Sequence, residues 1–184
     1  MDIFQPHYTY KAGGWKVFIF SLIFALVTSP LWPLGPNPLP GDPYIIVNKQ
    51  TNQLAYFQGE ELKEVHTVAT GKSKELTPEG EFTVTVKAIN PYYRKKDIAG
   101  GDPKNPLGTR WIGFDAEDTD GRTYGVHGTN NPYSIGGYVT QGCIRLENKN
   151  VEALFDRVPV GTKIWIVKTG KTFEELGREK GVLK

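Results

Sequence analysis

Short runs of alternating polar and apolar residues, separated by turn-forming residues, dominate this chain of 184 residues. The clearest run covers residues 81–87, where Phe82, Val84 and Val86 alternate with polar side chains. Such alternation is typical of a strand with one face in the core, and the Gly, Pro and Asn residues between the runs favour turns. We therefore expect a mainly β domain with strands at 44–47, 53–57, 62–69, 81–87, 111–114, 123–126 and 162–167.

Within this β region, one segment has clear helical spacing. Val151, Leu154 and Val158 fall on one face of a helix, Asn148 precedes them as a candidate N-cap, and Pro159 follows them. The predicted fold is therefore a β-sandwich or an open barrel with one packed helix.

The N-terminal part of the chain differs in character from this domain. Residues 1–16 contain Lys11 and Lys16, and residues 17–34 form an apolar stretch interrupted by two prolines. Positive charge before such a stretch, with none directly after it, predicts that the rest of the chain lies outside the cytoplasm. Three interpretations of 17–34 stay open: a helical membrane anchor, which its length favours, a cleaved secretory signal, and a buried core helix.

The predicted organisation has five segments. Six of the thirteen prolines lie between Pro30 and Pro43, which indicates a stiff, extended linker. The last residues are charged, and a short helix from Thr172 is compatible with them. The segments are an N-terminal region at 1–16, a hydrophobic helix at 17–34, a linker at 35–43, a catalytic domain at 44–168 and a charged tail at 169–184.

Charge and composition argue against several classes of function. The net charge is only +2, and the basic residues are scattered, so we expect no nucleic-acid partner. One cysteine and three dispersed histidines give no metal-ligand spacing, and no glycine-rich phosphate loop precedes a helix. We expect neither a metal nor another cofactor.

Cys143 is the single cysteine of the chain. Exported proteins use cysteines mainly in disulfide pairs, and an unpaired thiol is exposed to oxidation. A buried small residue is the structural alternative. Export and the neighbouring residues favour a nucleophile instead.

The residues around Cys143 complete a candidate reaction centre. His127, at the predicted end of a strand, is a candidate base, and a base or a cation near a thiol favours the thiolate. Gly142 frees the backbone to turn, and the amides of Gly142 and Cys143, with Gln141 as a further donor, are candidates for an oxyanion hole. In a strand at 142–146, Cys143 and Arg145 project from the same face. Each of these residues also has a structural alternative. His127 could be a surface histidine, Arg145 an arginine that anchors a loop, and Gly142 an ordinary turn glycine.

Five stretches of the sequence carry recognisable motifs: TPEGEF at 77–82, NPLGTRW at 105–111, YGVHGTNNPYSIGG at 124–137, GCIRL at 142–146 and VPVGT at 158–162. Together they resemble the L,D-transpeptidase catalytic domain, the YkuD-like family. The resemblance covers roughly residues 44–168. Here the pair Thr140–Gln141 stands before Gly-Cys, where the family commonly has Ser-His or Ser-Arg.

The resemblance implies a peptidoglycan enzyme of cell-wall biogenesis. Cys143 would attack the third residue of a donor tetrapeptide stem, D-Ala would leave with a proton from His127, and a neighbouring stem amine would resolve the thioester into a 3→3 cross-link. Water as acceptor would make the same site an L,D-carboxypeptidase. The backbone carbonyl of Gln141 would orient His127, and carbapenem-type inhibitors would acylate Cys143.

Substrate-binding candidates are Arg145, expected to hold the donor carboxylate, together with Gly128 and Thr140. Residues 90–109 form a long loop with Tyr92 and Tyr93, which we interpret as a substrate lid. The predicted location is the outer face of a bacterial cell membrane, or the cell wall if 17–34 is cleaved.

Two other functions are compatible with parts of this pattern. A sortase is also an exported Cys/His/Arg transpeptidase, but there the histidine lies far before the cysteine and the arginine several residues after it. A catalytically silent wall-binding or sensor module would need no thiol, base and amides together.

Overall fold

The computed structural model describes residues 39–73 and 75–184. The predictions for 1–16 and 17–34, and for residues 35–38 of the predicted linker, therefore lie outside the described residues. Among the residues that are described, no helix has both the length and the apolar character needed to cross a membrane.

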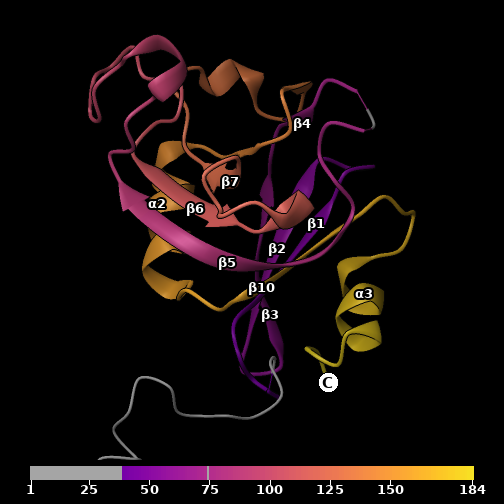
Figure 1. Cartoon of the computed structure of the whole chain (residues 1–184). Coiled ribbons are helices and arrows are strands. Elements are labelled where there is room, and N and C mark those ends of the chain that lie inside the picture. Colours follow the sequence, from indigo (N-terminus) through magenta and orange to yellow (C-terminus); the bar gives the residue numbers. More distant parts are fainter. Residues whose placement is uncertain (1–38, 74) are drawn as a thin grey trace, which may run out of the picture. The chain divides into compact units, whose positions relative to one another are not determined.

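Eight strands form one mixed sheet that curls into an open half-barrel (Figure 1). The open barrel is thus the better of the two expected β architectures. In sheet order the strands are β3 (Glu61–Thr67), β2 (Gln53–Gln58), β1 (Tyr44–Asn48), β10 (Lys163–Val167), β5 (Gly80–Ile89), β6 (Arg110–Phe114), β7 (Tyr124–His127) and β9 (Ile144–Arg145). A separate parallel pair joins β4 (Thr70–Gly71) to β8 (Tyr138–Thr140).

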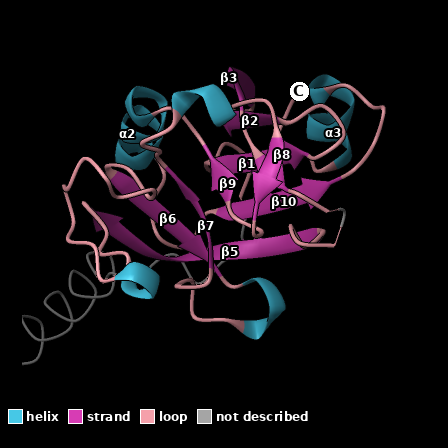
Figure 2. Cartoon of the chain, turned by 90° about the horizontal axis from the view of Figure 1, so that it is seen from above, coloured by secondary structure: helices cyan, strands magenta, loops and turns pink. Residues whose placement is uncertain are grey.

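Within residues 39–73 and 75–184, two α-helices lie toward opposite ends of the sheet (Figure 2). The sequence predicts one packed helix after Asn148 and is compatible with a short one from Thr172. The first is α2 (Asn148–Arg157), whose Val151 and Leu154 are buried in the main core. The prediction of Asn148 as N-cap is wrong, because Glu147 precedes the helix and Asn148 begins it. The Asn148 side chain instead accepts a hydrogen bond from the Thr129 amide at 3.0 Å, in the loop after β7.

The second helix, α3 (Phe173–Glu179), forms within the segment expected to be a charged tail. Thr172 and Glu175 make a reciprocal capping box at its start. Phe173 and Leu176 are buried in a second core cluster on the other face of β1 and β2. The segment is therefore charged on one side only and packs on the sheet with the other.

The two core clusters explain why β1 has no exposed residue. Ile45 and Val47 belong to the main cluster, whereas Tyr44 and Ile46 belong to the cluster under α3. Alternate side chains of one strand thus face opposite layers.

The arrangement of β7 and β9 positions the candidate site. These strands pair in parallel, with Val126 opposite Ile144 and His127 opposite Arg145. Val126 and Ile144 are both fully buried in the main core. Since side chains alternate along strands, His127 and Arg145 project from the opposite face.

Three 3₁₀ turns complete the described part of the chain. They are η1 (Arg94–Lys96) in the long loop before β6, η2 (Ala116–Asp118) after β6, and η3 (Pro132–Ser134) between β7 and β8.

Candidate active site

Cys143 immediately precedes β9 and lines a pocket of about 400 Å³. Its thiol is partly exposed, and Sγ lies 3.5 Å from the Thr123 carbonyl oxygen. No hydrogen bond between Sγ and His127 is found in the described part of the chain. The thiol is therefore reachable from the pocket, as a nucleophile requires.

The long loop 90–109 supplies much of the pocket wall. Tyr92 and Tyr93 both line it, which agrees with the expected position of this loop over the site. The loop is held by Asn105, which is 1% exposed and donates hydrogen bonds to the carbonyls of Pro91 and Ala99 at 2.8 and 3.0 Å. The other lining residues are Val86, Ala88, Pro91, Arg94, Lys95, Leu107, Trp111, Arg122 and Thr123.

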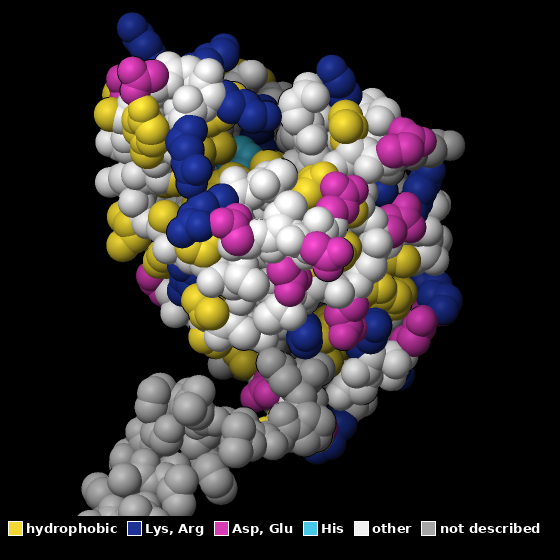
Figure 3. Space-filling view, viewed as in Figure 1, with side chains coloured by type: hydrophobic (Ala, Val, Ile, Leu, Met, Phe, Trp, Pro, Cys, Tyr) yellow, Lys and Arg dark blue, Asp and Glu magenta, His cyan; other side chains and the backbone are white. Residues whose placement is uncertain are grey.

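This lining is basic. Arg94, Lys95 and Arg122 contribute cations, and no Asp or Glu belongs to the described residues that line the pocket. Figure 3 shows Lys and Arg side chains around a hollow in the upper part of the molecule. Such a pocket favours a ligand that carries carboxylates.

His127 ends β7 and is held rigidly. It is 4% exposed, stacks on Trp111 with ring centroids 5.6 Å apart, and places Nδ1 2.6 Å from the carbonyl oxygen of Gly128. The sequence interpretation assigned the orienting carbonyl to Gln141, but in the structure it is that of Gly128. The reason is local, because the residue after a histidine can turn its own carbonyl onto Nδ1.

Burial dominates the electrostatics of His127 and Cys143. It lowers the pKa of His127 to about 4, against the opposing hydrogen bond to Gly128 and with a further lowering by the Arg145 charge. It raises the pKa of the Cys143 thiol to about 11, although the Gly125 backbone and the charges of Lys95 and Arg145 oppose this. Both shifts favour the neutral forms, so Cys143 needs a proton acceptor to become a thiolate.

The backbone before the thiol forms what we call the cysteine turn, residues 140–143. Gly142 has φ +130°, and a Cβ there would lie 2.3 Å from the carbonyl oxygen of Leu76, so only glycine fits. The Gly142 amide donates to Thr140 Oγ1 at 3.1 Å, and Thr140 Oγ1 donates to the Cys143 carbonyl at 2.7 Å.

These bonds change the predicted oxyanion hole. The Gly142 amide is engaged by Thr140, so it is not free to serve as a donor there. The Cys143 amide has no acceptor among the described residues. Of the Gly142 and Cys143 amides, only that of Cys143 is therefore available as a donor.

Three predicted substrate contacts have different positions in the structure. Arg145 is half-buried, donates from Nη1 to Ser134 Oγ at 2.9 Å, and lies outside the lining of the Cys143 pocket. Gly128 is buried where a Cβ would lie 2.1 Å from Asn148 Oδ1. Thr140 is 4% exposed and bonds within the cysteine turn. Gly128 and Thr140 thus support the site rather than line its pocket.

The sequence interpretation missed two contributors. Lys95 lies in the pocket and its charge lowers the pKa of the Cys143 thiol, while Thr77 bonds to the carbonyl of Gly142 at 3.0 Å. Thr77 lies in the TPEGEF stretch, which carried a signal of similarity but no role. Among the described residues, no group of His, Cys, Asp and Glu side chains is arranged to hold a metal ion.

Comparison with known proteins gives a consistent result. The family model of the YkuD L,D-transpeptidase catalytic domain matches residues 42–166. The putative L,D-transpeptidase YqjB of Bacillus subtilis is 58% identical over 166 residues, which cover 90% of this chain and 94% of that protein. The putative L,D-transpeptidase YkuD of the same organism is 34% identical over 71% of this chain and 70% of its own length.

Solved structures share the fold at low sequence identity. An L,D-transpeptidase from Mycobacterium smegmatis superposes with a TM-score of 0.54 at 22% identity, over 69% of this chain and 59% of that one. The catalytic domain of the E. faecium L,D-transpeptidase gives 0.53 at 21% identity, over 69% of this chain and 98% of that one.

Proposed function

The chain belongs to the family of L,D-transpeptidase catalytic domains, and from that premise we propose that it cross-links peptidoglycan through a thioester on Cys143. The observation that carries the proposal is the placement of Cys143. The thiol lies in a basic pocket, directly before β9, and β9 pairs with β7, the strand that ends in the buried, carbonyl-oriented His127.

In the acylation step, Sγ of Cys143 attacks the carbonyl carbon of the third residue of a donor tetrapeptide stem. His127 takes the thiol proton, and its low pKa keeps the imidazole in the neutral form that accepts a proton. The bond to the terminal D-Ala then breaks, and His127 returns the proton to the departing amine. The amide of Cys143 donates to the oxyanion of the intermediate.

In the second step, the side-chain amine of a neighbouring stem attacks the thioester carbonyl. The amine loses a proton to His127, and the thiolate that leaves takes it back. Because burial raises the pKa of the Cys143 thiol, we assign to His127 the removal of its proton as sulfur attacks in the first step. The cations of the pocket, Arg94 and Lys95 among them, hold the carboxylates of the stems.

Two further parts of the proposal concern inhibitors and location. A complex of the transpeptidase LdtMt1 with imipenem and a faropenem-derived adduct of L,D-transpeptidase 3 from Mycobacterium tuberculosis have been solved. By analogy, β-lactams of this type acylate Cys143 in this chain. The enzyme acts on the outer side of a bacterial membrane, anchored through 17–34 or released into the wall after cleavage.

The test is incubation of the full-length protein with purified tetrapeptide-stem muropeptides, followed by mass spectrometry of the products. The expected result is release of D-Ala and formation of 3→3 dimers, both abolished in Cys143→Ala. Release without dimers would identify a carboxypeptidase. Unchanged muropeptides with folded wild-type protein would overturn the proposal.

A further inference from the structure

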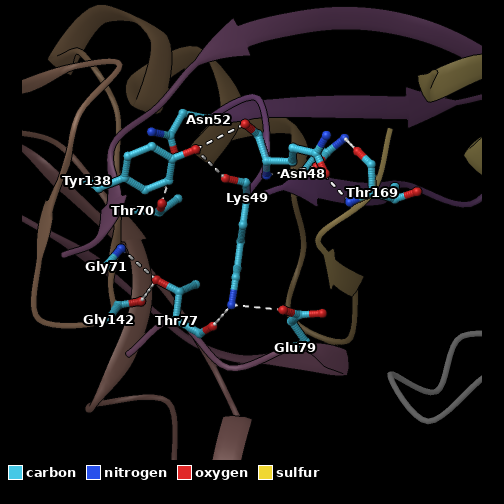
Figure 4. Close-up of polar contacts among 11 residues, drawn as sticks. Asn48, Lys49, Asn52, Thr70, Gly71, Thr77, Glu79, Tyr138, Gly142 and Thr169 are labelled. Atoms are coloured by element: carbon cyan, nitrogen blue, oxygen red, sulfur yellow. Dashed lines mark hydrogen bonds and ion pairs between the residues drawn. The ribbon is translucent and has the colours of Figure 1, made fainter. Parts of the chain in front are cut away.

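A chain of buried polar contacts reaches the carbonyl of Gly142 in the cysteine turn (Figure 4). It begins at Lys49, which is 5% exposed and donates from Nζ to the carbonyl of Thr77 at 2.6 Å. Nζ also lies 3.1 Å from a carboxylate oxygen of Glu79. Two contacts from one lysine therefore hold the turn that carries Thr77.

Thr77 is fully buried, and its hydroxyl has a fixed direction. Its Oγ1 accepts from the Gly71 amide at 2.9 Å, so the single hydroxyl proton is left for the carbonyl of Gly142, 3.0 Å away. A valine at this position would have nearly the same shape but could make neither bond. Serine would keep both.

The carbonyl of Gly142 and the amide of Cys143 belong to the same peptide plane. In a planar trans peptide these two groups point in opposite directions. A hydrogen bond that fixes the carbonyl therefore also fixes the direction of the Cys143 amide. It polarises the peptide as well, which strengthens that amide as a donor.

Gly142 makes this control necessary. Its φ of +130° lies in a region where glycine moves freely, so the backbone alone does not define the plane. The two bonds of Thr140 Oγ1 restrain the turn at the Gly142 amide and at the Cys143 carbonyl. The Thr77 bond restrains it at the Gly142 carbonyl.

We propose that Thr77 and Lys49 are positioning residues for the acyl transfer at Cys143. Thr77 sets the peptide plane whose amide receives the oxyanion, and Lys49 holds Thr77 in place. This inference rests on the proposed function. Neither residue lines the Cys143 pocket; both line a different pocket, of about 290 Å³. We assign them no contact with the donor stem.

The test compares two reactions of Cys143 in the full-length protein. Acylation by imipenem passes through an oxyanion, whereas alkylation by iodoacetamide does not. Thr77→Val should lower the maximal rate constant of acylation roughly ten- to a hundredfold and leave the imipenem concentration at half-saturation unchanged. The rate of alkylation should stay within about twofold of the wild-type rate. Thr77→Ser should restore acylation.

Thr70→Val is the matched control. Thr70 is 1% exposed and its hydroxyl donates to Asn52 Oδ1 at 2.6 Å, so the variant loses a buried hydrogen bond without touching Gly142. It should melt at a lower temperature and acylate at the wild-type rate. Lys49→Met keeps the Thr77 hydroxyl but removes the lysine contacts that hold its turn. The ratio of the acylation rate to the alkylation rate should therefore fall, by less than in Thr77→Val. If Thr77→Val does not fold, Lys49→Met provides the test.

The failures are distinguishable. Wild-type protein that imipenem leaves unmodified would contradict the proposed function and the inference with it. Wild-type protein that acylates would overturn the inference alone in two cases: if Thr77→Val acylates equally fast, or if Thr77→Val and Thr70→Val slow both reactions alike.

Discussion

Two regions meet at Cys143: buried polar groups that fix the backbone of the cysteine turn, and a pocket whose wall includes exposed side chains. Thr77 and Thr140 are at most 4% exposed and bond to the cysteine turn, whereas Tyr92 in the pocket wall is 53% exposed. The contrast indicates a division of labour. We expect changes on the buried side to act on the rate of the chemical step, and changes in the pocket to act on substrate binding.

The largest effect is expected at His127, the proposed proton acceptor. His127→Gln removes the proton acceptor, and the rate of D-Ala release should fall roughly 10²- to 10⁴-fold. His66→Gln is the matched control, because His66 lies on β3 with Glu64 as its partner and should keep wild-type activity. Equal activity in the two variants would contradict the role of His127.

The cysteine turn offers a test of backbone geometry. Gly142→Ala should lower the free energy of unfolding by about 3 kcal/mol and strongly reduce activity, because the new Cβ clashes with the Leu76 carbonyl. Gly59→Ala separates strain from clash, since Gly59 has φ +64° but open space around it. Urea unfolding should show a loss of only about 1 kcal/mol there. Similar losses in both variants would mean that the clash contributes nothing.

Acid should reveal the burial of His127 as a loss of stability. Its pKa is about 4 in the folded state and about 6.5 when unfolded, so the unfolded chain binds more protons between these values. Stability should therefore fall as the pH drops from 6.5 to 4, by roughly 2–3 kcal/mol from this group. Urea unfolding at several pH values measures the slope, and His127→Gln should flatten it. An equal slope in that variant would contradict the assignment.

The smallest effect is expected in the pocket wall. Lys95→Gln removes one of the pocket cations and should raise KM for stem peptides about three- to tenfold, with less change in kcat. Lys96→Gln is its control, since Lys96 is exposed next to Lys95 but does not line the pocket. A fall in kcat with unchanged KM would contradict the claim that the pocket wall acts on substrate binding and the buried groups act on the chemical step.

The strands could be predicted from the sequence because alternation is a local signal. The prediction that Cys143 and Arg145 share one face agrees with the burial of Ile144 and Leu146, the residues that alternate with them. The packing of α3 was missed, since three apolar positions in a charged segment are too few to indicate a buried face. The N-cap at Asn148 was also missed, because the competing bond to Thr129 comes from a distant loop.

The candidate site was predictable as a set of residues but not as a set of interactions. Cys143, His127 and Arg145 were named from spacing and resemblance, and β7 and β9 bring their positions together. Turn geometry determines that the Gly142 amide bonds to Thr140 and that the Gly128 carbonyl orients His127. Tertiary burial determines the raised pKa of the Cys143 thiol. No pattern in the sequence encodes these directly.

The most direct measurement of the central claim is mass mapping of the enzyme quenched during reaction with a tetrapeptide donor. We predict a tripeptide acyl adduct on the tryptic fragment 123–145, attached to Cys143 and released by the acceptor amine. An adduct on any other residue would contradict the account. So would turnover without an adduct on this fragment when the acceptor amine reacts slowly enough for the acyl-enzyme to accumulate.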